Sequence, residues 1–284
     1  MKKKVKLLTY VLVVVTLGSL LIACSANKAV VKDQEEKANI VEKTSFTTST
    51  EDKKGKKTEK EGKKEEERKE KIKISLNEKV IKEDTEAITI DIRYPIISGH
   101  PDRTIEAKLN SSFEEKVIGL KDMMQKGAVE ALQYSKENDV EFQKYMAQSS
   151  FKERYNKNGF LSLTISTFEF MGGSEGIRAT TAYNIDIGSG KVYQLHEIFA
   201  ENCDFKKIID EVMLNTMKEN EDKYFQGVID DFQGISGDQP FYIEDGNLVV
   251  YFGVYQLGPI STGEPEFKVP LSKFEFKEGL GINE

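Results

Sequence analysis

Hydrophobic and polar residues alternate in several separate stretches of the chain, which is the pattern of half-buried β-strands. Isoleucines, for example, occupy every second position from residue 88 to residue 92. The strands predicted in this way are 86–94, 160–170, 181–187, 241–243, 248–255 and 267–271, with 192–195 able to pair back onto the third. Residues 150–195 are accordingly predicted to form an antiparallel meander.

Three local signals refine these strands. Pro95 is expected to end the first strand, because proline has no amide hydrogen for the ladder. In 160–170 the hydrophobic phase slips by one position, which predicts a β-bulge near Ser166–Thr167. Asp245-Gly246, between two predicted strands, is a strong signal for a tight hairpin.

Hydrophobic residues spaced by three or four positions predict amphipathic helices in other parts of the chain. The longest helix is expected to open at Pro101 and to continue, with a weaker pattern, to about Asn138. Two shorter helices are predicted over 205–217, with Asp204 as the N-cap, and over 224–232.

Strands that are segregated from the helices between them predict an α+β fold, with antiparallel sheets packed by helices. The folded unit is predicted to span 74–284, a length that supports a hydrophobic core without disulfides. The order of the elements also allows two lobes joined near residue 195.

The first 24 residues have the layout of a secretory signal peptide. A basic start is followed by an apolar run of about 16 residues, and the segment ends in Leu21-Ile22-Ala23-Cys24. This ending resembles the bacterial lipobox, in which the cysteine receives a diacylglycerol and becomes the new N-terminus. The run is short for a membrane span, which needs roughly 20 residues. We therefore predict a lipoprotein, lipidated at Cys24 and anchored to the extracytoplasmic face of the cell membrane.

Residues 25–73 are predicted to be a disordered, charged linker. They contain 15 basic and 12 acidic residues and a single aromatic residue, so they bury too little surface to fold. Residues 74–284 contain 22 basic and 36 acidic residues, a net charge of −14. A domain this acidic repels the phosphates of nucleic acids and suits a basic partner.

Candidate chemistry in the chain is sparse. Two cysteines and two histidines exclude a disulfide scaffold and a zinc cluster, and we expect no metal and no cofactor. Gly172–Gly176 matches the Gly-x-Ser-x-Gly nucleophile motif around Ser174, but a predicted strand follows where the motif requires a helix. His196-Glu197 lacks the second histidine of a zinc protease, since position 200 is alanine. Gly172–Gly176 is therefore interpreted as a Gly-rich hairpin loop, and no catalytic residue is expected in the chain.

Several short segments together resemble a known family. They are Phe170–Gly173, Tyr183–Asp186, Gly188–Lys191, Leu195–Phe199, and Tyr255 followed by Gly263 and Phe267–Pro270. They resemble the C-terminal extracellular domain of RsiV-like anti-sigma factors, a domain that also precedes the catalytic domain of PdaC-like peptidoglycan deacetylases. The resemblance covers roughly 75–275 and implies a cell-envelope binding domain, because RsiV-like members bind lysozyme. Where this family has a small residue and a histidine after the double glycine, the chain has Ser174-Glu175.

The resemblance and the charge lead to one functional hypothesis. We expect a non-catalytic binding domain for a basic lysozyme-like protein or another envelope component such as peptidoglycan. Its predicted binding residues are Glu175, Glu264 and Glu266 in two Gly-rich loops, with Tyr255 as an aromatic anchor. Two alternatives stay open: a serine hydrolase that uses Ser174, and a structural or assembly lipoprotein of the envelope.

Overall fold

The computed structural model describes residues 72–282. The predicted signal peptide with Cys24, and nearly all of the predicted linker, lie outside these residues. Two sheets and two α-helices form the described part, so the prediction of an α+β fold is confirmed. Each sheet contributes to a separate hydrophobic cluster, which fits two lobes. No helix in this part of the chain is both long enough and apolar enough to span a membrane.

The first sheet has six strands in the order β1-β2-β3-β4-β5-β6. They are β1 (Ser75–Asp84), β2 (Ile88–Ser98), β3 (Tyr145–Lys157), β4 (Phe160–Phe170), β5 (Ile177–Asp186) and β6 (Lys191–Val192). All neighbours are antiparallel except β2 and β3, which run parallel. This pair corrects the prediction of purely antiparallel sheets. The helix α2 (Arg103–Asn138) lies between the two strands in the chain and provides the crossover that a parallel pair requires.

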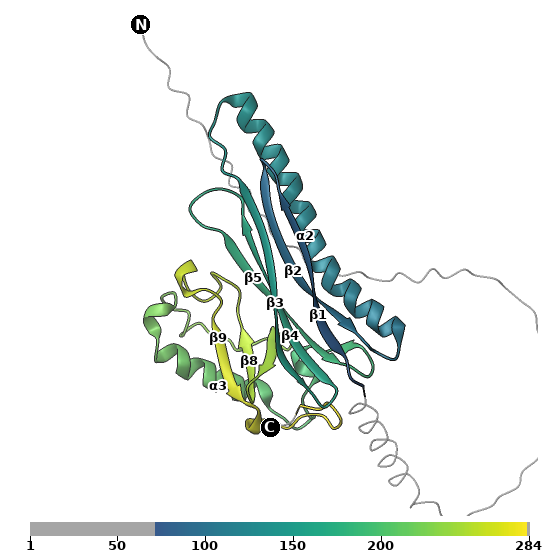
Figure 1. Cartoon of the computed structure of the whole chain (residues 1–284). Helices are drawn as coiled ribbons and strands as arrows, with labels where there is room; N and C mark the ends of the chain where they lie inside the picture. Colours follow the sequence, from purple (N-terminus) through teal and green to yellow (C-terminus); the bar gives the residue numbers. More distant parts are fainter. Residues whose placement is uncertain (1–71, 283–284) are drawn as a thin grey trace, which may run out of the picture. The chain divides into compact units, whose positions relative to one another are not determined.

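Helix α2 runs along the first sheet and forms the core of the first lobe with it (Figure 1). The Asp102 side chain caps its N-terminus by accepting hydrogen bonds from the amides of Thr104 and Ile105. The hydrophobic stripe expected from the sequence begins with Ile105, which is half-buried, and continues with residues that are buried: Leu109, Phe113, Val117, Leu120 and Met124. The helix continues to Asn138, as predicted.

Strand β2 continues past Pro95 to Ser98, so the prediction that proline would end it is wrong. The amide and the carbonyl of Arg93 both bond the hydroxyl of Ser149, so they point toward β3. Backbone groups two residues apart on a strand point the same way, so the nitrogen of Pro95 also points toward β3. The parallel pairing has already ended at Ile92, and no ladder bond on that side needs the missing hydrogen. On its other side the strand continues to pair with β1.

Strand β4 has two buried faces and not the predicted bulge. Its hydrophobic residues from Leu161 to Ile165 belong to the core under α2, while Ser162 and Thr164, on the opposite face, are also buried. The register between β4 and β5 is unbroken, and the irregularity of this sheet lies in β3, around residue 154. The hydrophobic pattern therefore changes phase near Ser166–Thr167 because both faces of β4 are buried, and the strand itself contains no bulge there.

The second sheet has three antiparallel strands in the order β7-β8-β9. They are β7 (Phe241–Glu244), β8 (Asn247–Tyr251) and β9 (Glu266–Pro270). Asp245 and Gly246 have φ values of 50° and 73° and form the predicted hairpin turn. The predicted helix α3 (Phe205–Lys218) packs its apolar face into the core of this lobe. Short 3₁₀ turns complete the lobe: η1 (Leu195–Glu197), η2 (Glu221–Lys223), η3 (Ile260–Thr262) and η4 (Leu271–Lys273).

Residues 224–232 do not form the predicted helix. After η2 the chain continues in turns, and Gly227 adopts a positive φ of 85° that a regular helix excludes. The hydrophobic residues of this segment, among them Val228 and Phe232, still pack against the second core. The spacing of these hydrophobic residues therefore predicted correctly that they pack against the core, but the helix that it predicted does not form.

Polar side chains of the first sheet join the two lobes. The Ser162 hydroxyl donates to Oδ1 of Asn184 (2.7 Å) and accepts from the amide of Ile243 in β7 (3.0 Å). Nδ2 of Asn184 donates to the carbonyl oxygen of Phe241 (2.8 Å). Strand β7 pairs with β8 on one side, and side chains of the first sheet bond its outer edge.

The exposed edge of β5 is closed in a similar way. The Tyr251 hydroxyl accepts from the amide of Ala182 (3.0 Å) and donates to the carbonyl of Thr180 (3.2 Å). Burial is the main reason why the pKa of this phenol is raised above its ordinary value. The second lobe thus covers backbone groups that the short strand β6 does not reach.

Candidate functional site

The Gly-rich loop that follows Phe170 is the turn of the hairpin formed by β4 and β5. Gly172 and Gly173 both have a positive φ, which only glycine adopts readily. The amide of Gly173 donates to Oε1 of Gln143, in the connection between α2 and β3. The loop is therefore fixed to a second segment, at the end of the sheet where α2 ends.

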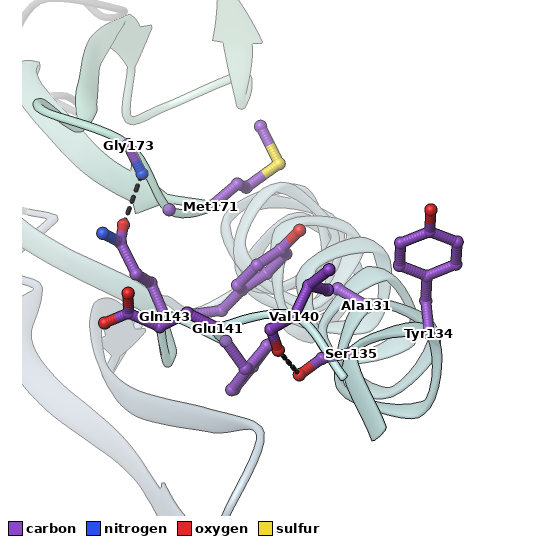
Figure 2. A pocket seen from close by; sticks show the side chains of 11 residues that line it. Ala131, Tyr134, Ser135, Val140, Glu141, Gln143, Met171 and Gly173 are labelled. Atoms are coloured by element: carbon purple, nitrogen blue, oxygen red, sulfur yellow. Dashed lines mark hydrogen bonds between the residues drawn. The ribbon is translucent and has the colours of Figure 1, made fainter. Parts of the chain in front are cut away.

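A groove of about 430 Å³ lies between these two segments and the last turns of α2. Figure 2 shows Met171 of the hairpin loop on one side and Tyr134 of α2 on the other. The remaining lining residues are Ala131, Ser135, Val140, Glu141, Phe142, Gln143, Tyr145, Gly172 and Gly173. Apart from the two glycines and Met171, the sequence did not point to this groove, because its residues are spread over three segments.

Ser174 and Glu175 are both exposed in the hairpin loop. Because strand β5 begins at Ile177, Ser174 does not stand at the strand-to-helix turn that a hydrolase nucleophile occupies. His196 lies in the second lobe, and its Nδ1 bonds the carbonyl oxygen of Gly237 (3.1 Å). The geometry therefore gives no support to the hydrolase alternative.

The other histidine, His100, is buried and has a structural role. Its Nε2 donates to the carbonyl of Ile187 (2.7 Å), and its Nδ1 accepts from the amide of Asp102 (3.0 Å). The Nδ1 atom also lies 2.9 Å from the carbonyl oxygen of Asp102. His100 thus ties the start of α2 to the end of β5.

The second loop predicted for binding connects β8 to β9, and Glu264 fixes it in place. The Glu264 carboxylate accepts from the amide (2.7 Å) and the hydroxyl (2.6 Å) of Thr180 in β5. Thr180 belongs to the strand that leaves the Gly-rich loop, five positions beyond Glu175 in the chain. The carboxylate of Glu264, which the sequence suggested as a binding group, is therefore already bonded within the protein. Glu264 positions the loop between β8 and β9 against β5.

Tyr255 is the exposed aromatic residue of this loop, with 63% of its surface accessible. Its φ of 70° is rare for a large side chain, and such strain persists only where the surroundings impose it. Its ring meets that of Phe225 edge to face, with 5.1 Å between the centroids. Sequence analysis missed Phe225, because the spacing placed it in a helix that does not form.

The segments that carry these two rings are bound to each other. The amide of Phe225 donates to the carbonyl of Leu257 (2.9 Å), and the hydroxyl of Thr262 donates to the carbonyl of Lys223 (2.6 Å). Gly258 makes this approach possible, because a Cβ there would lie 2.3 Å from the Lys223 carbonyl oxygen. The Tyr255–Phe225 pair is therefore presented on a rigid support.

Glu266, the last of the predicted binding residues, is exposed at the start of β9. Burial and the neighbouring Glu266 carboxylate raise the pKa of Tyr242, whose hydroxyl makes no hydrogen bond with residues 72–282. The guanidinium of Arg154 lies over the Tyr242 ring, 4.3 Å from its centroid. Glu266 thus borders the junction of the lobes, while no contact recorded within 72–282 joins Glu175 to the other three predicted residues.

The Arg154 guanidinium also donates to Glu244 (2.9 Å), which bonds Lys152 as well. Burial alone would raise the pKa of Glu244, but hydrogen bonds from the two cations outweigh it and hold the pKa below its usual value. This cluster joins β3 of the first sheet to β7 of the second.

Comparison with known proteins agrees with this organisation. The family model described as Deacetylase PdaC matches residues 81–178, and that of a protein of unknown function (DUF3298) matches 196–272. Anti-sigma-V factor RsiV of Bacillus subtilis (strain 168) is 27% identical over 211 residues, which are 67% of this chain and 65% of that relative. The chain carries an RsiV-like domain.

Solved structures resemble the RsiV-like domain as well. A DUF3298 family member from Bacteroides fragilis NCTC 9343 superposes with a TM-score of 0.54 at 17% identity, over 74% of this chain and 96% of the other. A DUF3298 family protein from Pseudomonas aeruginosa PAO1 has a TM-score of 0.46 at 16% identity, over 75% and 96%. The first of these supports the fold.

Proposed function

We propose that the RsiV-like domain is the extracytoplasmic, non-catalytic binding module of a lipid-anchored surface protein, and that its ligand is a basic protein of the lysozyme type. The observation that carries the proposal is the bond between Glu264 and Thr180. It holds the loop after β8 against the strand that follows the Gly-rich loop. The loop that carries Tyr255 is thereby fixed to the strand that leads away from Glu175.

The chemistry of this surface suits a basic partner. The Tyr255–Phe225 pair supplies exposed aromatic area on a rigid support, which is the usual character of an interface anchor. Glu175 and Glu266 are exposed acids, and residues 74–284 carry a net charge of −14. Such charges act mainly on the association rate and on its salt dependence. The likeness to an anti-sigma factor further supports a binding or regulatory role over an enzymatic one.

The membrane anchor is proposed from the sequence of residues 1–24. Acylation of Cys24 would hold the domain outside the membrane on a charged linker of 49 residues. Mass spectrometry of the mature N-terminus tests this proposal. An unmodified cysteine, or a retained Met1–Ala23 segment in wild-type cells, would contradict it.

Titration with a basic lysozyme at low and moderate salt tests the ligand. We expect binding by the wild type, and weaker and less salt-dependent binding by the Glu175→Lys variant. Tyr255→Asn removes the ring while keeping a residue that tolerates positive φ, so its loss of binding would not follow from new backbone strain. Glu201→Lys, an equal charge reversal at an exposed position of the second lobe, is the matched control.

Other outcomes would redirect the assignment. If the wild type does not bind lysozyme at low salt, the lysozyme-type ligand is wrong. Capture from envelope extract of membrane proteins alone would then favour the structural or assembly alternative. Labelling of Ser174 by a fluorophosphonate probe, abolished in Ser174→Ala, would establish the hydrolase alternative instead.

A further inference from the structure

The groove between α2 and the hairpin loop has an exposed apolar lining. Tyr134, Val140 and Met171 keep 62%, 47% and 51% of their surface accessible, although all three border one depression. Beneath them the rings of Phe142 and Tyr145 are stacked, with 6.0 Å between centroids and 15° between planes. Contiguous exposed apolar surface of this kind marks interaction sites on soluble domains.

Carboxylates without partners surround this lining. Glu141 lines the groove, Asp139 lies two residues before it, and Glu130 stands one helical turn before Tyr134 on the same face of α2. Glu175 adds a fourth carboxylate from the hairpin loop. None of the four side chains makes a hydrogen bond or an ion pair with residues 72–282, and all four residues are exposed.

The lysines nearest to Asp139 and Glu141 in the chain are engaged elsewhere. Lys136 pairs with Glu86 (2.8 Å), and Lys144 pairs with Asp84 (2.5 Å), both at the turn between β1 and β2. Asp139 and Glu141 are thus left without a lysine partner among residues 72–282, while Lys126 stands one helical turn before Glu130. Charge of one sign around a concave site raises the local concentration of ligands of the opposite sign.

The groove is also preformed. Its two loop segments are joined through Gln143 and Gly173, and the Ser135 hydroxyl donates to the carbonyl of Val140 (2.6 Å), as Figure 2 shows. Asp139 ends α2 in the left-handed conformation, which turns the chain sharply into the groove wall. A rigid site loses little entropy on binding, so modest apolar contacts suffice for affinity.

We propose that this groove binds a cationic amphipathic peptide, whose apolar side chains would enter between Met171 and Tyr134 while its basic side chains meet the surrounding carboxylates. A flexible methionine beside aromatic rings adapts to varied apolar side chains, as promiscuous peptide-binding surfaces do. An anionic glycan would be repelled by the same carboxylates. The site goes beyond the proposed lysozyme-type ligand, because its lining includes neither Tyr255 nor Phe225, and Glu175 is the one residue that both proposals use.

Fluorescence anisotropy with a labelled 14-residue peptide of leucine and lysine, arranged with one apolar helical face, tests the proposal on the full chain. We expect saturable binding that weakens with salt. The charge-removing triple variant Glu130→Gln, Asp139→Asn, Glu141→Gln should weaken binding about tenfold at low salt and flatten the salt dependence. Met171→Ser with Tyr134→Ser should weaken it about tenfold at every salt concentration.

Matched controls separate the groove from general acidity. The triple variant Glu201→Gln, Glu275→Gln, Glu278→Gln removes three exposed acids of the second lobe, and Val80→Ser removes an exposed apolar residue of β1. Both should bind the peptide as the wild type does. A peptide with glutamate in place of lysine, and one with serine in place of leucine, should not bind.

Clear results would overturn the proposal. Equal losses in control and groove variants, or no binding by the wild type at low salt, would show that the groove is not the site. Binding of chitin oligosaccharides in place of the peptide would assign the groove to a glycan. Lysozyme titration of the same variants keeps the two proposals distinct, since Tyr255→Asn should affect lysozyme alone and the Met171 and Tyr134 changes the peptide alone.

Discussion

Replacing Ser162 by alanine tests how firmly the two lobes are joined. The Ser162 hydroxyl is fully buried and serves two partners, the amide of Ile243 and Oδ1 of Asn184. Ser162→Ala leaves a buried donor and a buried acceptor unpaired. Each unsatisfied group costs about 1–3 kcal/mol, so we expect the free energy of unfolding to fall by about 2–6 kcal/mol.

Urea unfolding followed by circular dichroism measures this loss. Ser166→Ala on the same strand is the control, because the Ser166 hydroxyl bonds only the Thr180 hydroxyl (3.0 Å) at a part-buried site. Its expected cost is below about 1 kcal/mol. If the lobes separate before they unfold, Ser162→Ala should also split the transition into two steps with smaller m-values. A Ser162→Ala cost no larger than that of the control would refute the reasoning.

Three further outcomes are expected from the packing. Ile209→Ala should lower the free energy of unfolding by about 2–5 kcal/mol in chemical denaturation, because Ile209 is fully buried in the second core. Gly258→Ala should cost about 1–3 kcal/mol in the same assay and weaken lysozyme binding, since its Cβ would collide with a backbone carbonyl that supports the aromatic pair. Glu244 has a lowered pKa in the folded state, so its stabilising contribution is complete above the unfolded value of 4.5 and disappears as the pH falls through the lower folded value. Glu244→Gln should therefore be less stable than the wild type at neutral pH but lose less stability on acidification, as thermal melts between pH 3 and 7 would show.

Local periodicity was enough to predict the elements with strong one-sided burial. Helix α2 and helix α3 were predicted because their apolar residues face a single core, and the hairpin at Asp245 was predicted from its Asp-Gly turn. Strand β1 was missed, because it is an edge strand whose side chains are mostly exposed and whose charges continue those of the linker. The parallel pairing of β2 with β3 was missed as well, since no local pattern states which strand a crossover helix leads to.

The candidate site was harder to predict than the fold. Glu175 and Tyr255 were found as exposed residues of Gly-rich loops, which is a signal that the sequence carries. The role of Glu264 depends on Thr180, which is 84 positions away in the chain, and the groove at Met171 is closed by α2. Such contacts join residues that are far apart in the chain, so the local pattern of charge and hydrophobicity does not predict them.

The side chains of Tyr251 and Glu264 also have a consequence for solubility. They occupy the amides of Ala182 and Thr180 and the carbonyl of Thr180, groups that would otherwise be free on the outer edge of β5. Unpaired strand edges are templates for pairing with other chains. A shortened chain that ends after β6 would expose this edge, so we expect it to self-associate where the longer chain stays monodisperse. The second lobe would then protect the first from aggregation, independently of any ligand that it binds.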